Sequence, residues 1–260
     1  MGHKHFTVLG IDPASSYCAV GIDGKVEKLE SPKLTAYISK KWQEARGRDR
    51  GLLIVWDSPL SYSSNDPNAY STRPIEKATK SVIKKRTEVS TKGAVNTQGF
   101  TGVTHWALTL CVTGIWIDGQ RHGPQWSDAL FQLVDSPDML NRSRINVVEM
   151  HPAVALAGWW EEKIRGEPSQ PFPKYKGFNK ATGKDICTTI WTAIGHGDCP
   201  DFDQTRLKPD DILDAWAGWR LGEDWLRGRA KFIGTSTSGG FLLPKGDFAA
   251  EIEERLQAIS

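Results

Sequence analysis

Two short, largely apolar runs constrain the fold of this chain more than any other feature. Leu52–Trp56 contains only apolar residues, and Ile145–Val148 is interrupted by Asn146 alone. Runs of this kind are typical of strands that are covered on both faces of a sheet. Because segments with helical periodicity lie between them and after them, the sequence predicts a single α/β domain over residues 1–260.

Three further strands are expected at the beginning of the chain. Phe6–Ile11, Tyr17–Ile22 and Val26–Leu29 have the pattern of short strands. Asp23-Gly24 separates the last two and is a strong signal for a tight hairpin turn. These strands are therefore expected to form an antiparallel meander.

The spacing of apolar residues predicts most of the remaining elements. Helices are expected over 33–46, 75–87, 105–115, 125–134, 152–165, 185–194 and 210–227, and strands at 231–233 and 241–243 precede a helix from Asp247. The segment 166–184 has three Pro and three Gly without periodicity, which predicts a functional or mobile loop. Residues 231–260 would form a hairpin–helix extension of the domain.

Charge is balanced overall but uneven along the chain. The 33 Lys and Arg against 31 Asp and Glu leave a net charge of +2, which excludes a protein coated indiscriminately with positive charge. Residues 73–92 hold seven basic against two acidic residues, 163–184 hold six against one, and 198–214 hold six acidic against two basic. The two basic segments predict contacts to a nucleic-acid backbone, with a solvated helix face and a soluble loop as the alternative.

The candidate contacts for the nucleic acid are Arg73, Lys77, Lys80, Lys84, Lys85, Arg86, Lys174 and Lys176. Two aromatic residues, Tyr175 and Phe178, lie among the last of these. Such an arrangement suits base stacking on a flexible strand, and the same residues would also serve as loop anchors.

No segment of the sequence indicates a membrane or a secretory route. The longest apolar stretch, Trp106–Ile117, is too short to span a bilayer, and no apolar leader segment precedes the first expected strand. The four cysteines contain no CxxC pair: Cys18, Cys111, Cys187 and Cys199. We therefore expect a cytoplasmic protein with free thiols and no membrane contact.

Acidic residues terminate three of the expected strands. Asp12 directly follows VLGI, Asp57 follows LLIVW, and Glu149 follows INVV. In α/β sheets, catalytic and ligand-binding groups gather outside the strand ends. A single acid at such a place is more often a turn or cap residue, but three acids brought together need a compensating cation. A divalent metal ion would supply that charge.

The late helix adds two more carboxylates. Asp211 and Asp214 are three residues apart and share a helix face, which continues in the small residues Ala215, Gly218 and Gly222. These small residues would let the helix backbone approach a sheet closely. The preference for acids in the first turn of a helix also explains Asp211, whereas Asp214 lies beyond that turn.

The motifs resemble those of RNase H-like nucleases. VLGIDPASSYCAVGI is similar to the first hairpin of RuvC-type Holliday-junction resolvases, with Ala14 in place of their usual glycine, and DDILDAWAGWR is similar to their Asp-x-x-Asp-Ala helix. A fuller resemblance is to a bacterial and archaeal domain-of-unknown-function family of predicted RNase H-like nucleases. Six motifs of that family recur here in the same order: a Gly-x-Asp strand, Asp-x-Pro, an Arg helix, Glu-x-His-Pro, an Asp-x-x-Asp-Ala helix and a Gly-x-x-x-Pro hairpin. The Asp-x-Pro motif is Asp57–Pro59, the Glu-x-His-Pro motif is Glu149–Pro152, and the hairpin motif is Gly240–Pro244.

This resemblance implies an RNase H-like fold, in which a mixed five-stranded sheet has three antiparallel leading strands and helices on both faces. It also implies a nuclease that hydrolyses DNA or RNA with two Mg²⁺ or Mn²⁺ ions. Asp12 would bridge the ions, Asp57 would bind one, and Asp211 and Asp214 would bind the other, with Glu149 as an auxiliary ligand. Oxygen ligands suit these ions, and a pair of ions suits in-line displacement at a phosphodiester. Resolvases of this type act as homodimers, although the sequence identifies no dimer surface.

Two alternatives remain open. An ATP-dependent phosphotransferase of the actin and sugar-kinase type also places an acid after its first strand, but it needs a second phosphate loop and an adenosine motif that the sequence does not show. A non-catalytic nucleic-acid-binding module would keep the fold and use the acids structurally. The distances among the carboxylates distinguish a metal site from dispersed structural acids.

Overall fold

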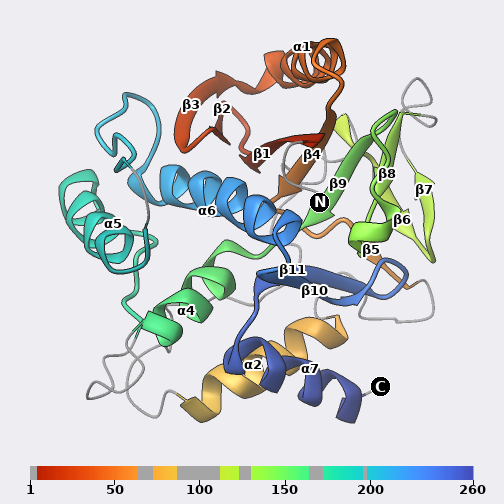
Figure 1. Ribbon diagram of the computed structural model, residues 1–260. Coiled ribbons are helices and arrows are strands. Elements are labelled where there is room, and N and C mark those ends of the chain that lie inside the picture. Colours follow the sequence, from red (N-terminus) through yellow and green to blue (C-terminus); the bar gives the residue numbers. More distant parts are fainter. Residues whose placement is uncertain are drawn as a thin grey trace.

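A six-stranded mixed sheet forms the centre of the computed structural model (Figure 1), which describes residues 5–63, 73–86, 112–122, 130–163, 172–195 and 198–259. The three leading strands are antiparallel, as predicted: β1 (Phe6–Asp12) pairs with β2 (Tyr17–Ile22), which pairs with β3 (Lys25–Glu30). On the other side of β1, β4 (Gly51–Trp56) and β9 (Ile145–Glu149) continue the sheet in parallel. The predicted α/β class is therefore confirmed.

The sheet has one strand more than the five that the resemblance to RNase H-like nucleases implies. β8 (Phe131–Leu133) pairs in parallel with β9 at the edge, so the helix predicted over 125–134 is wrong at its end. Three residues are too few for helical and strand periodicity to differ, and only the pairing with β9 selects the strand. Residues 123–129 lie outside the described part of the chain.

A second sheet consists of three short strands, β5 (Ser61–Tyr62), β6 (Ile115–Ile117) and β7 (Gln120–His122). The turn at Asp118-Gly119, with both residues at positive φ, joins β6 to β7. This is the turn geometry that tight hairpins require. The helix predicted over 105–115 is therefore wrong over 113–115, which are not helical, and the part of it before residue 112 lies outside the described residues.

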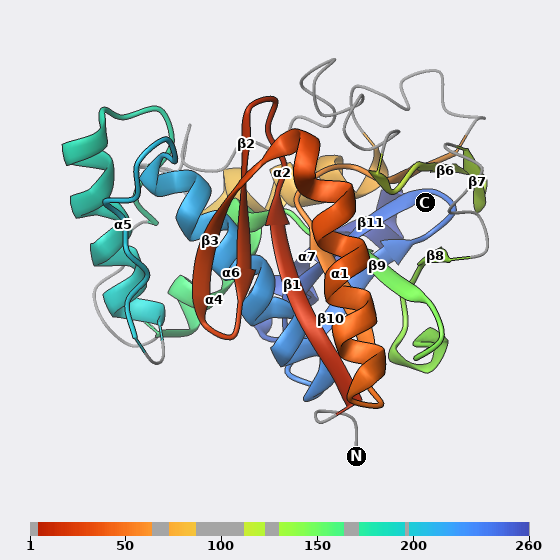
Figure 2. The ribbon, with the colours of Figure 1, turned by 90° about the horizontal axis from the view of Figure 1, so that it is seen from above.

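Alternation along β4 divides the core into two layers. Its residues 52, 54 and 56 pack in one cluster with Leu34 and Ile38 of α1 (Leu34–Gly47), and its residues 53 and 55 pack in another with α6 (Pro209–Leu226). Figure 2 shows α1 and α6 on opposite faces of the sheet. α4 (Pro152–Lys163) contacts α6, so both helices cover the same layer. Helices on both faces are thus confirmed.

The backbone of helix α6 packs directly against the backbone of strand β1. A Cβ atom added to Gly10 of β1 would lie 2.2 Å from the carbonyl oxygen of Ala215, and one added to Gly218 would lie 2.9 Å from the Cα atom of Gly10. A Cβ atom on Gly222 would lie 2.5 Å from a methyl group of Val8. The small-residue face predicted for this helix is therefore the face that packs on the sheet.

Part of the predicted loop over 166–184 is helical. α5 (Lys180–Ile194) begins after Asn179, whose side chain accepts a hydrogen bond from the N–H of Thr182 at 3.0 Å. Asn is among the strongest N-cap residues, and this cap starts the helix inside a segment of loop-like composition. Residues 164–171 lie outside the described part of the chain.

The chain ends in a hairpin and a helix, as predicted. β10 (Ala230–Thr235) pairs with β11 (Gly239–Pro244), and α7 (Asp247–Ile259) packs against α2 (Pro74–Arg86). None of the helices in the described residues is both long and apolar enough to cross a membrane.

Candidate metal centre

Asp12 and Asp57 lie side by side at the carboxyl edge of two parallel strands. Asp12 is the last residue of β1, and Asp57 directly follows β4. The pairing places Ile11 opposite Trp56, and the N–H of Asp57 donates to the carbonyl oxygen of Ile11 at 2.9 Å. Neighbouring parallel strands thus bring both carboxylates to one edge of the sheet.

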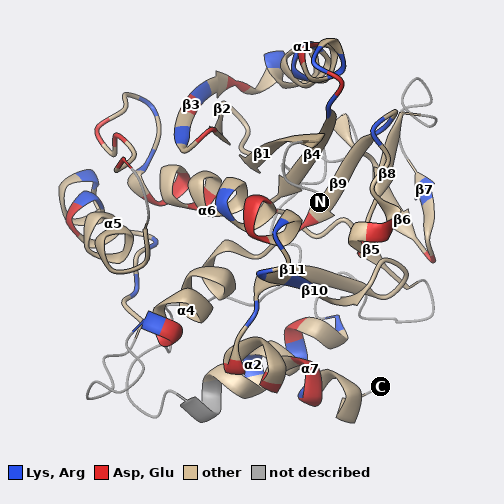
Figure 3. Cartoon of the chain, in the orientation of Figure 1, with Lys and Arg blue, Asp and Glu red and all other residues tan. Residues whose placement is uncertain are grey.

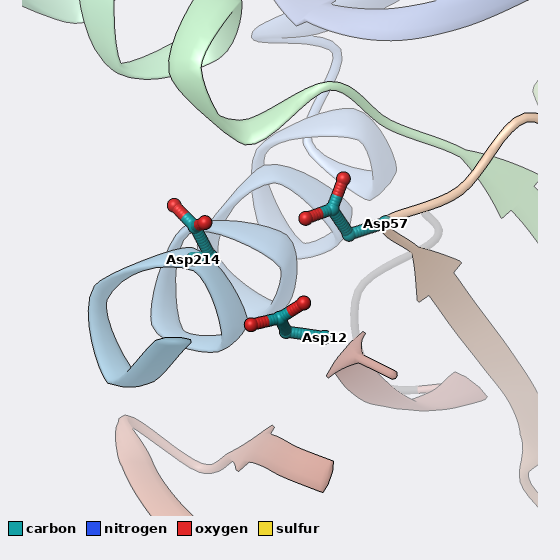
Figure 4. A group of neighbouring side chains, drawn as sticks. All are labelled: Asp12, Asp57 and Asp214. Atoms are coloured by element: carbon teal, nitrogen blue, oxygen red, sulfur yellow. The ribbon is translucent and has the colours of Figure 1, made fainter. Parts of the chain in front are cut away.

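Helix α6 contributes a third carboxylate, which belongs to the buried Asp214. One oxygen atom each of Asp12, Asp57 and Asp214 lie within 4.8 Å of one another. Figure 4 shows the three side chains directed toward a common space between the strand ends and the helix. Three carboxylate oxygens this close together are able to hold a metal ion. We call these three residues the acidic centre.

Burial and mutual repulsion raise the pKa values of the acidic centre. The pKa of Asp12 lies well above its ordinary value because the carboxylate is buried and faces Asp57 and Asp214. Burial raises the pKa of Asp57 to about 7, although Lys176 acts in the opposite direction. Burial also raises the pKa of Asp214 against the effect of Lys176. The site therefore favours bound protons or a cation over three bare carboxylates.

Two consecutive residues outside the sheet contact Asp214. The hydroxyl of Tyr175 donates to Oδ1 at 2.7 Å, and the ammonium of Lys176 lies 2.6 Å from Oδ2. Tyr175 is buried, with its ring centroid 5.9 Å from that of Phe172, so it has the role of a loop anchor rather than of an exposed stacking platform. Sequence reasoning places neither residue at the acidic centre, because 39 residues separate Tyr175 from Asp214. It predicts Lys176 as a contact of the nucleic acid, whereas in the structure the ammonium of Lys176 pairs with Asp214.

Asp211 lies beside the acidic centre but is not one of the three clustered acids. Its Oδ2 accepts a hydrogen bond from the N–H of Lys208 at 3.2 Å, which caps the start of α6. Burial and the neighbouring Asp210 raise the pKa of Asp211 to about 6. The observed contact is that of a cap residue, and the role of metal ligand stays a prediction.

Glu149 is not one of the three clustered acids, and Arg73 neutralises its carboxylate. The guanidinium of Arg73 donates to both carboxylate oxygens, with Nη1 2.9 Å from Oε2, and the N–H of Leu60 donates to the same Oε2 at 2.8 Å. Arg73 also pairs with Glu76, and its side chain is 4% exposed. The prediction of Arg73 as a nucleic-acid contact is therefore wrong. The contacts of Glu149 are those of an internal ion pair rather than of an auxiliary ligand.

The other predicted nucleic-acid contacts are spread over two segments. Lys77 and Lys80 are exposed on α2. Lys174 is exposed as well, and its ammonium lies 5.6 Å from the ring centroid of Phe178, a residue that is 40% exposed. Figure 3 shows that Lys and Arg also occur on α1 and β3, so the basic residues are not confined to these two segments. The side chains of three further candidates lie outside the described part of the chain: Lys84, Lys85 and Arg86.

Comparisons of the chain with models of protein families, with curated proteins and with solved structures find no match. The functional argument therefore depends on the fold and on the geometry of the acidic centre. The resemblance to RNase H-like nucleases stays an expectation that the motifs support.

Proposed function

We propose that the chain is a metal-dependent nuclease with an RNase H-like fold, which hydrolyses phosphodiester bonds of DNA or RNA. The observation that carries this proposal is the convergence of Asp12, Asp57 and Asp214 within 4.8 Å. Carboxylates that are buried together repel one another unless a cation compensates, and Mg²⁺ and Mn²⁺ are cations that prefer oxygen ligands.

The order of the strands supports the RNase H-like fold. Three antiparallel leading strands are followed by two parallel strands in the order β3-β2-β1-β4-β9, with β8 added at the edge. Three antiparallel leading strands in a mixed sheet are what the motif resemblance implies. It also explains the site, because β1 and β4 are adjacent and parallel in such a sheet.

Asp12, Asp57 and Asp214 would hold two Mg²⁺ or Mn²⁺ ions, with Asp211 available one helical turn before Asp214. The bound ions would supply the positive charge that activates a water and stabilises the leaving 3′-oxygen of a phosphodiester. Two of these residues stand at the ends of adjacent strands, and the hydroxyl of Tyr175 would orient the third through Oδ1.

Lys174 and Phe178 are suited to contact the nucleic acid. An exposed ammonium over an exposed aromatic ring offers one group to a phosphate and another to a base. Lys77 and Lys80 would add phosphate contacts from α2. A homodimer, as in resolvases, is a separate prediction that light scattering of the purified chain would test.

Cleavage assays with the Asp12→Asn variant test the proposed function. The wild-type protein should cleave at least one single-stranded, duplex, hybrid or branched oligonucleotide in the presence of Mg²⁺ or Mn²⁺. Asp12→Asn should lose at least about a hundredfold of that activity, since the central ligand loses its charge. The matched control is Asp49→Asn, which makes the same change at a side chain that is 91% exposed and should keep full activity.

The outcome also separates the alternatives. Activity that survives Asp12→Asn would refute the assignment of the site. Absence of cleavage on every substrate, together with absence of Mn²⁺ binding, would favour a non-catalytic module. Thermal stabilisation by a nucleotide would favour a phosphotransferase.

A further inference from the structure

The side chain of Lys176 places a positive charge at the acidic centre, although Lys176 lies outside the strands and the helix that carry the three acids. Its ammonium lies 2.6 Å from Oδ2 of Asp214. The same charge opposes the rise in the pKa values of Asp12 and Asp57 that burial causes, so it acts on all three carboxylates. Lys176 is therefore the counter-ion of the acidic centre in this structure.

Contacts of the preceding residue fix the position of Lys176. The preceding residue, Tyr175, is buried and donates from its hydroxyl to Oδ1 of Asp214 at 2.7 Å. Its ring packs against Phe172, and Phe172 packs edge-on against Trp160 of α4 at a centroid distance of 6.0 Å. The backbone before Lys176 is thus anchored to the core, and consecutive side chains contact both oxygens of Asp214.

A metal ion bound by the acidic centre and this ammonium would share the carboxylate of Asp214. Two cations on one carboxylate lie within a few Å of each other, where they repel each other even at the effective dielectric constant near a protein surface. We propose that the ammonium of Lys176 is an internal competitor of the divalent cation, so that metal binding displaces Lys176 from Asp214. This inference rests on the proposed function, because it requires the acidic centre to bind metal.

The competition predicts tighter metal binding when Lys176 loses its charge. The experiment is titration calorimetry of Mn²⁺ into the metal-free, full-length chain, without substrate. Lys176→Met should bind Mn²⁺ at least about tenfold more tightly than the wild type, because no ammonium has to be displaced. Unfolding temperatures give a second readout: metal-free Lys176→Met should melt below the wild type, and Mn²⁺ should raise its melting temperature by more.

Lys174→Met is the matched control. This substitution removes the same charge from the same segment. In the wild type, however, the Lys174 ammonium lies over the ring of Phe178, and both residues are exposed. Its Mn²⁺ affinity should stay within about twofold of the wild type, because exposed charges are screened. If Lys176→Met does not fold, Lys176→Gln gives the same comparison, since glutamine can still donate to Asp214 without carrying a charge.

The results separate this inference from the proposed function. Equal Mn²⁺ affinity of the wild type and Lys176→Met would overturn the competition and leave the nuclease proposal intact. Equal tightening by both variants would also overturn it, because general charge would then explain the change. If none of the three proteins binds Mn²⁺ and none cleaves a substrate, both proposals are wrong.

Discussion

The guanidinium of Arg73 forms ion pairs with two buried carboxylates. Its partners are Glu149 and Glu76, and the side chains of all three residues are at most 4% exposed. Burial raises the pKa of Glu149, and the charge of Arg73 lowers it. A buried charge without a partner costs several kcal/mol, so loss of one member leaves the others destabilised. Arg73 therefore stabilises the fold at the position where strand β9 ends.

Arg73→Met should lower the free energy of unfolding by about 3–5 kcal/mol, because two buried carboxylates lose their counter-ion. Lys77→Met, four residues further along the chain at an exposed position, should change it by less than about 0.5 kcal/mol. Urea denaturation of both variants measures the difference. Similar stability of the two would show that Arg73 is not needed to neutralise Glu149 and Glu76.

At the scale of elements, the contact between α6 and β1 positions the acidic centre. Gly10 lies against the backbone of α6 next to Ala215, and Asp214 is the residue before Ala215. A side chain at Gly10 would force the helix away from the strand. Since Asp12 is two residues beyond Gly10 on the same strand, such a shift would also separate two of the three carboxylates.

Gly10→Ala should lower the free energy of unfolding by about 3 kcal/mol and weaken Mn²⁺ binding at the same time. The matched control is Gly47→Ala at the end of α1, where an added Cβ meets nothing within 4 Å. That substitution should be neutral or slightly stabilising, because alanine favours a helix. Urea denaturation and calorimetry measure the two effects. Wild-type stability and affinity of Gly10→Ala would contradict the close packing of α6 on β1.

At the scale of the whole molecule, folding places acids where their charge is unfavourable. The ordinary pKa of Asp57 is 3.8, and burial raises its pKa in the folded protein to about 7. Between these values the folded state binds more protons than the unfolded state. The contribution of Asp57 to stability therefore decreases as the pH rises through this range, which is the opposite of a carboxylate held by a salt bridge.

Asp57→Asn should remove this pH dependence, since asparagine does not ionise. Without metal, the variant should be more stable than the wild type at about pH 8, and the difference should disappear toward about pH 4, where Asp57 becomes protonated in both states. Urea denaturation across this range measures it, with the exposed Asp49→Asn as control. Mn²⁺ should favour the wild type instead, because it binds the complete set of ligands. A difference that is independent of pH would contradict the burial of a charged Asp57.

Much of the acidic centre is predictable because it follows from local patterns. Acids that terminate apolar strands identify Asp12 and Asp57, and helical spacing identifies Asp214. The same patterns predict the antiparallel leading strands and the small-residue face of α6. Local patterns do not predict the edge strand β8. Its three residues are too few to show a periodicity, and only pairing with β9 defines them as a strand.

The sequence alone was therefore sufficient for strands β1 to β4 and β9 to β11, for most of the described helices and for the three residues of the acidic centre, since each follows from a local pattern of residues. Only the tertiary structure decided which charges meet. Arg73 lies 76 residues from Glu149, and Tyr175 lies 39 residues from Asp214. When partners are so far apart in the sequence, no local pattern distinguishes a basic residue that is buried as a counter-ion from one that is exposed to solvent. Burial and pairing, which determine its pKa and its partner, arise only when the chain is folded.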